Sequence, residues 1–259
     1  MKSLPMTSGF SFQRSKWVTY RLLVINKKKY ALGIGGTLIG LFAFWLLIGV
    51  FSAQQSLLES SAIVLAFGTV IYQIGGYVLT ASVFSELQSP GSASQFLTLP
   101  ATTGEKLFSG WVISYVLYTV VVFLGLSLLL LIMTFTSNLF FNAEIQNLTE
   151  LTDIYLNNVV LVYLIFNSVF LLGATYFRGN NFLKTAFSIL LFMAFVGFMM
   201  VIITYILGSN NITFTIAPFA YFNIDNTFLK ILLQLLFTLP FTALFLSFSY
   251  FRLKYRQVA

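Results

Sequence analysis

The run VVVFLGLSLLLLIM, from Val120 to Met133, contains no charged residue and decides the fold class. Its apolar side chains do not alternate with polar ones, as they would in a strand of a transmembrane β-barrel. The run lies inside a longer apolar stretch, Gly110–Phe135. A helix rises about 1.5 Å per residue, so about 20 residues cross the ~30 Å hydrocarbon core of a bilayer. We therefore predict that this stretch is a transmembrane α-helix.

The chain contains six apolar stretches of this kind, and its composition agrees with a membrane protein. Of its 259 residues, 58% are hydrophobic and 8% are charged, with a mean hydropathy of +0.91. A water-soluble domain of this size would have too little charged surface to stay in solution. Because lipid offers the backbone no hydrogen-bond partners, we predict an all-α polytopic membrane protein with six transmembrane helices. The predicted helices are Ala31–Phe51, Ala62–Val83, Gly110–Phe135, Ile154–Phe177, Thr185–Leu207 and Phe228–Phe251.

The basic residues indicate how the predicted helices are oriented. Of the 14 Lys and Arg residues, 13 fall before the first apolar stretch or after the second, fourth and sixth, which leaves only Lys230 on the other side. The positive-inside rule then predicts that both termini face the cytoplasm. This excess, with attraction to anionic lipid headgroups, explains the net charge of +7, so we expect a lipid bilayer and no nucleic acid as partner.

The predicted organisation has three parts. Residues 1–30 form a cytoplasmic segment, residues 31–251 a six-helix transmembrane domain, and residues 252–259 a cytoplasmic tail. The first apolar stretch is long and begins near residue 31, so no cleavable signal peptide is expected. The outer connection 208–227 contains ITFTIAPFAYFNI, which is apolar and aromatic but too short to cross a bilayer. We expect it to re-enter the outer leaflet or to lie flat on it.

Residue types that are absent exclude several classes of chemistry. The chain has no histidine and no cysteine, which excludes zinc and haem sites and the catalytic triads that need either residue. It has no phosphate-binding P-loop sequence, so ATP hydrolysis would have to occur on another chain. No charged residue lies near the middle of a predicted helix, where ion-coupled carriers usually place one. We predict a non-catalytic subunit without cofactor or metal that is driven from outside itself.

A basic segment precedes the first predicted transmembrane helix. It reads RSKWVTYRLLVINKKKY from Arg14 to Tyr30. Arg14, Arg21 and Lys28 are spaced by seven residues, so a helix would align them in one stripe beside Trp17. This pattern favours a helix that lies on the inner membrane surface, and the alternative is an unspecific cytoplasmic anchor.

Small and polar residues inside the apolar stretches indicate helix contacts or a path. Gly36 and Gly40 lie four residues apart, a spacing that permits close approach of two helices. Gln73, Asn167 and Gln234 lie within the second, fourth and sixth stretches. Such residues either line an internal path or form hydrogen bonds between helices.

The longest predicted cytoplasmic connection, residues 84–108, reads FSELQSPGSASQFLTLPATTGEKLF. We expect a break at Ser89–Gly91, then a short amphipathic helix over Ser94–Leu99 that Pro100 stops, with Thr102 or Thr103 capping the next helix. A simple linker needs only about five residues. The length of this connection, with Phe96, Leu97 and Leu99 expected to be exposed, predicts docking to a cytoplasmic partner. The alternative is a loop packed on its own helices.

These features together resemble an ABC-2-type permease, the membrane subunit of an ATP-binding-cassette exporter. The resemblance extends from about residue 14 to residue 256, and LPATTGEKLFSGW is similar to permeases of Bacteroidetes-like bacteria. Gln95 departs from the family pattern, which has an acid there, and the arginine usual beside Glu86 is missing. The residues that stand in the order of the family's coupling helix are Glu86, Ser89–Gly91, Phe96, Leu97, Thr98, Leu99, Pro100, Ala101, Thr102, Glu105 and Lys106.

The resemblance implies a function as well as a fold, and it implies a location in the inner membrane of a bacterium. Two copies, or this chain and a paralogue, would form a translocation path between them, and cytoplasmic ABC ATPase subunits would engage residues 86–106. The basic segment with Arg14, Trp17, Arg21 and Lys28 would be the family's interface helix. The cargo would be amphipathic, such as a lipid, glycolipid, peptide or drug. The alternatives are a non-transporting subunit that anchors a larger envelope complex and an autonomous channel or facilitator.

Overall fold

The computed structural model describes residues 9–51, 57–88, 90–140, 159–207 and 227–258. Every regular element within these residues is helical, which confirms the all-α prediction for the described part of the chain. The long helices are α1 (Phe12–Phe51), α2 (Leu57–Val83), α5 (Tyr118–Phe140), α8 (Asn181–Leu207) and α9 (Thr227–Val258). The shorter elements are η2 (Ser85–Gln88), α3 (Pro90–Leu97), α4 (Thr103–Trp111), the π-helical segment η3 (Val112–Leu117) and α7 (Val160–Tyr176).

Five helical stretches are long and apolar enough to cross a membrane, so the chain is a multi-pass membrane protein by helix length and hydropathy. One of them, Thr103–Thr136, joins α4, η3 and most of α5 into a single long helix. The fourth predicted helix is described as α7, which is apolar but shorter than the others. The predicted start of that helix at Ile154 lies outside the described residues, as does nearly all of the outer connection 208–227.

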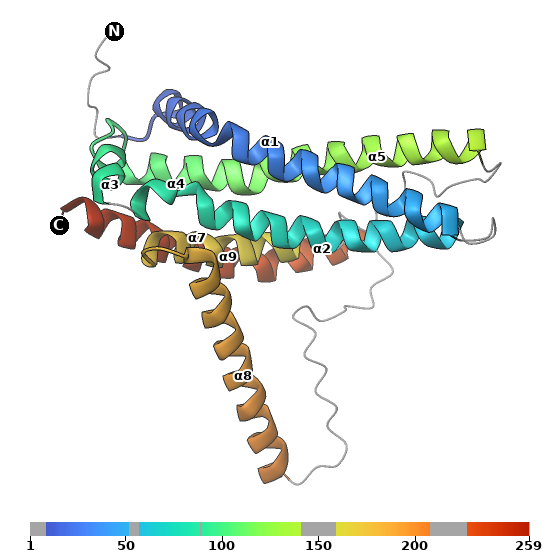
Figure 1. Ribbon diagram of the computed structural model, residues 1–259. Helices are drawn as coiled ribbons and strands as arrows, with labels where there is room; N and C mark the ends of the chain where they lie inside the picture. Colours follow the sequence, from blue (N-terminus) through green and yellow to red (C-terminus); the bar gives the residue numbers. More distant parts are fainter. Residues whose placement is uncertain (1–8, 52–56, 89, 141–158, 208–226, 259) are drawn as a thin grey trace.

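The first turn of α1, helix α3, the start of α4, the turn between α7 and α8, and the last turn of α9 all lie at one end of the bundle (Figure 1). All of these segments except α3 carry lysine or arginine. We call this end of the bundle the basic end. The arrangement agrees with the sequence pattern from which orientation was predicted, and the side of the membrane that the basic end faces stays a prediction.

Helices α1, α2 and α5 run side by side, and α7 packs against both α2 and α9 (Figure 1). Helix α8 instead projects away from the other helices (Figure 1), and only 6% of its apolar window Asn181–Ile202 is buried. Its outward side chains include Leu190, Phe192 and Phe195. An apolar surface of this size requires lipid or another chain to cover it.

The core midway along the bundle is rich in tyrosine. Tyr72 from α2, Tyr118 from α5 and Tyr163 from α7 are buried together, with Trp45 of α1 in the same cluster. A Cβ atom on Gly76 would overlap the ring of Tyr163. Glycine in the middle of α2 therefore makes room for the tyrosine that joins α7 to it.

The close approach predicted at Gly36 and Gly40 does not occur within the described chain. Both are exposed, and a Cβ atom added to either would have no described atom within 4 Å. Among the described residues, the tight glycine contacts occur at Gly75, Gly76, Gly110, Gly125 and Gly173, each against a side chain of another segment. A contact of Gly36 and Gly40 with a helix of another chain stays a prediction.

The predicted interface segment is not a separate helix. Helix α1 runs without interruption from Phe12 through Tyr30 into the first apolar window, Tyr30–Leu47. Its first turns are set at an angle to the remainder (Figure 1). The turns that carry Arg14 and Arg21 therefore belong to the same continuous helix as the membrane-crossing part.

Candidate functional site

The connection between α2 and the long helix that begins with α4 is folded into three short elements, η2, α3 and the first turn of α4. Helix α3 begins at Pro90, so the predicted helix start at Ser94 was wrong. In the predicted break at Ser89–Gly91, Ser89 lies outside the described residues, and Pro90 and Gly91 belong to α3. Proline is favoured in the first helical turn because its fixed φ suits a helix and its missing N–H has no partner there. Helix α3 ends at Leu97, two residues earlier than predicted.

Thr102 caps α4, as predicted. Its hydroxyl oxygen accepts from the backbone N–H of Glu105 at 3.3 Å, and the carboxylate of Glu105 accepts from the backbone N–H of Thr102 at 2.8 Å. This reciprocal pair is a capping box, which satisfies two backbone donors that a helix start otherwise leaves unpaired.

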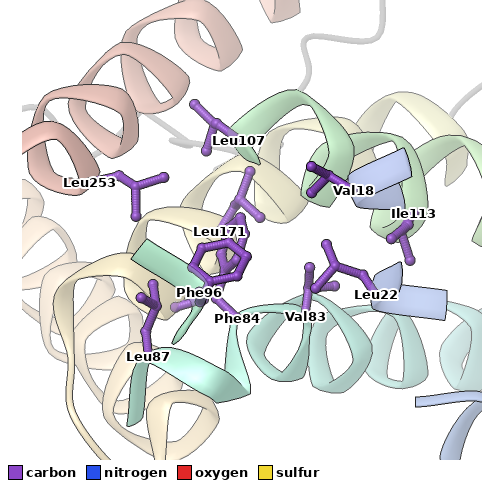
Figure 2. Close-up of a cluster of buried hydrophobic side chains, with 11 residues drawn as sticks. Val18, Leu22, Val83, Phe84, Leu87, Phe96, Leu107, Ile113, Leu171 and Leu253 are labelled. Atoms are coloured by element: carbon purple, nitrogen blue, oxygen red, sulfur yellow. The ribbon is translucent and has the colours of Figure 1, made fainter. Parts of the chain in front are cut away.

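Phe96 is buried, and the prediction that it is exposed was wrong. Its side chain is only 1% exposed and lies against Phe84, with ring centroids 5.8 Å apart. Leu97 and Leu99 are half-buried against the same cluster. The alternative of a loop packed on its own helices therefore holds for these side chains. The cluster, which we call the basic-end core (Figure 2), consists of Val18, Leu22, Val83, Phe84, Leu87, Phe96, Leu107, Ile113, Leu171, Ala174 and Leu253.

Lys106 of α4 forms a hydrogen bond with the end of α3. Its Nζ donates to the backbone carbonyl oxygen of Leu97 at 2.8 Å and lies 5.6 Å from the centroid of the Phe96 ring. The last carbonyl groups of a helix lack partners within the helix and carry partial negative charge, so a buried ammonium group stabilises them. The cation also interacts favourably with the face of the aromatic ring.

Two ion pairs join α1 to this connection. In the buried pair, the guanidinium of Arg14 donates to Oε1 of Glu105 from Nη2 at 2.8 Å and from Nε at 3.1 Å. In the second, Nη1 of Arg21 lies 2.8 Å from Oε2 of Glu86. The first two members of the predicted basic stripe are therefore paired with carboxylates of this connection. Lys28, the third member, and Trp17 are exposed.

The outer face of α3 remains bare in the described chain. Gly91, Ser94, Gln95 and Thr98 are exposed, as is Pro100 in the turn that follows. These residues are small or polar, whereas the inner side of the same helix carries Phe96 into the basic-end core. The arrangement gives a short helix that is held firmly on one side and is free to accept a partner on the other.

The polar residues in the middle of the bundle form hydrogen bonds between helices. Nδ2 of Asn167 donates to Oγ1 of Thr80 at 2.7 Å and to Oγ of Ser114 at 3.1 Å. The hydroxyl of Tyr163 donates to the backbone carbonyl of Ser114, in η3, at 2.6 Å. Of the two alternatives for these residues, interhelical bonding therefore holds for Asn167.

The other two polar residues predicted to line a path or bind another helix lie in different surroundings. Gln73 accepts from the hydroxyl of Tyr77 at 2.8 Å, a contact within α2. Gln234 is buried on α9.

Comparison with protein-family models, with curated proteins and with solved structures gave no match. Among the described residues there is also no cluster of carboxylates that could hold a metal ion. The resemblance to ABC-2 permeases therefore stays a prediction. The ion pairs of Arg14 and Arg21 were not predicted, because local sequence carries no signal for partners so far away in the chain.

Proposed function

We propose that this chain is the transmembrane permease subunit of an ABC exporter, driven by separate cytoplasmic ATPase subunits. The observation that carries the proposal is that α3, a short helix between two membrane-crossing helices, is packed on one side and exposed on the other. Its inner side is fixed by Phe96 and by the bond from Lys106 to Leu97. Its outer side presents Ser94, Gln95 and Thr98 without cover from the described chain.

A partner that pushes on α3 would also move the helices that are bonded to it. The bond from Lys106 passes the displacement to α4 and so to the long helix Thr103–Thr136. The ion pairs at Glu86 and Glu105 pass it to α1. Coupling of this kind requires contiguous packed or hydrogen-bonded contacts between rigid elements. ATP-driven closure of two ATPase subunits would supply the push.

The translocation path would form between this chain and a second copy or paralogue. A path between subunits suits a chain whose own central polar residues bind one another, as Asn167 binds Thr80 and Ser114. The cargo would be amphipathic. The competing function is a membrane anchor that assembles a larger envelope complex without transport, and the apolar surface of α8 suits such contacts as well.

The test is recovery of an ABC ATPase encoded beside this chain after co-expression and purification in detergent. Phe96 is unsuitable as the altered residue, because a charge in the basic-end core would disturb folding. Ser94 is exposed on the outer face of α3, so Ser94→Trp changes the docking surface and leaves the core intact. We expect at least tenfold weaker association, which corresponds to about 1.4 kcal/mol.

Thr136→Trp is the matched control, because Thr136 lies near the far end of α5. It should leave recovery of the ATPase unchanged. Equal recovery with Ser94→Trp and with the wild type would remove the docking role of α3. If no ATPase is recovered even with the wild-type chain, the membrane-anchor function replaces the exporter.

A further inference from the structure

A groove lies between the first turns of α1 and the turn that joins α3 to α4. Its volume is about 440 Å³, within the range of about 300–1,000 Å³ that small-molecule sites occupy. One wall consists of Trp17, Tyr20 and Val24 of α1, and the other of Leu99, Pro100 and Ala101. The family resemblance assigns Leu99 and Pro100 to ATPase coupling, whereas in the structure they line this groove.

The α1 wall exposes apolar and aromatic surface. Trp17 and Tyr20 are each 62% exposed and lie edge to face, with ring centroids 6.4 Å apart. Val24 and Ile25 are exposed one turn further along the helix. Tryptophan and tyrosine are enriched at the headgroup level of membranes, because each has an apolar ring and a polar group.

One end of the groove lies close to the apolar window of α1. Val24 precedes Tyr30, the first residue of the apolar window of α1, by six residues, or about 9 Å of helix. A lipid at the membrane surface therefore reaches the groove without leaving its own leaflet.

Cations outnumber carboxylates around the groove. Arg14 and Arg21 line it and are paired with Glu105 and Glu86. Lys28 is exposed one turn beyond Val24 on the same face of α1, and it forms no ion pair with a described residue. Positive charge thus exceeds negative charge beside the apolar groove, which suits a ligand with an anionic head and a hydrocarbon tail.

We infer that an anionic phospholipid occupies this groove. One acyl chain lies along Trp17, Tyr20 and Val24, and the phosphate group lies near Arg21 and Lys28. A zwitterionic lipid would gain less from these cations, since its own ammonium group opposes them. The inference does not depend on an ATPase partner, because the groove shares only Pro100 with the exposed residues of α3 and the turn that follows it.

Tryptophan quenching by brominated lipid tests the inference on the full chain reconstituted in phosphatidylcholine vesicles. Bromine quenches only nearby rings. Of the three tryptophans, Trp17 lies in the groove, Trp45 is buried in the tyrosine-rich core, and Trp111 ends α4 outside the groove. We expect phosphatidylglycerol with brominated acyl chains to quench more than brominated phosphatidylcholine at the same mole fraction. Trp17→Phe should remove this excess. Lys28→Gln should weaken the preference for phosphatidylglycerol about fivefold, the effect of one basic residue at an anionic surface.

Lys254→Gln is the matched control. Lys254 is exposed at the basic end, on α9, so its loss changes the net charge equally but leaves the groove intact. The preference for phosphatidylglycerol should survive this change. Equal quenching by the two lipids would overturn the inference and leave the groove to a protein segment. A preference that persists in Trp17→Phe, or that falls as much in Lys254→Gln as in Lys28→Gln, would also overturn it.

Discussion

Glu105 is the residue on which most contacts of the basic end converge. Its carboxylate accepts from the backbone N–H of Ser11 at 2.6 Å, from the Arg14 guanidinium, and from the backbone N–H of Thr102. The side chain of Glu105 has no exposed surface, so its charge depends on these donors rather than on water. One residue therefore fixes the start of α1, the start of α4 and the distance between them.

Glu105→Gln should destabilise the protein strongly. It would leave the Arg14 guanidinium buried without an opposite charge, and breaking one side of a buried pair costs about 3–5 kcal/mol. The measurement is the apparent melting temperature of the purified chain in detergent. Glu86→Gln is the control, because the Arg21–Glu86 pair is partly exposed, at 31% and 13%, and should contribute only about 0–1 kcal/mol. A similar melting temperature for the two variants would contradict the expectation that the buried pair contributes more to stability than the partly exposed pair.

At the scale of elements, the sequence predicted those features that depend on residues close together in the chain. Apolar runs marked the membrane-crossing helices, and the threonine–glutamate spacing marked the start of α4. The bounds of α3 were missed because Pro90 suits a helix start as well as a break. The partners of Arg14 and Arg21 lie 91 and 65 residues away, and their pairing depends on how separate helices pack. A spacing of seven residues predicts a shared helix face but not what that face contacts.

Two glycines show the same difference between what local sequence predicts and what helix packing decides. Gly76→Ala should destabilise the bundle strongly, because the added methyl group overlaps the buried ring of Tyr163 and forces α2 and α7 apart. Gly40→Ala should be neutral or stabilising by about 0.5–1 kcal/mol, because it has no described neighbour within 4 Å and alanine favours a helix. Apparent melting temperatures of both variants in detergent would decide this. A larger loss for Gly40→Ala than for Gly76→Ala would contradict the packing described for α2 and α7.

At the scale of the whole molecule, the distribution of charge and the arrangement of the helices agree. Among the described residues, the segments that carry most of the lysine and arginine come together at one end of the bundle (Figure 1). Clusters of lysine and arginine are retained on the cytoplasmic side during insertion, so this end should face inward and carry α3 with it. A docking surface for an ATPase and a groove for an anionic phospholipid of the inner leaflet both require that orientation.

Single cysteines test the orientation directly, because the chain has no cysteine of its own and so gives no background labelling. Ser94→Cys places a thiol on the exposed outer face of α3 at the basic end, and Asn147→Cys places one in the connection on the opposite side of the predicted topology. An impermeant maleimide applied to intact cells should label Asn147→Cys and should label Ser94→Cys only after the membrane is opened. Labelling of Ser94→Cys in intact cells would reverse the topology. It would also remove the ATPase site from α3, because ATP and the ATPase are present only in the cytoplasm.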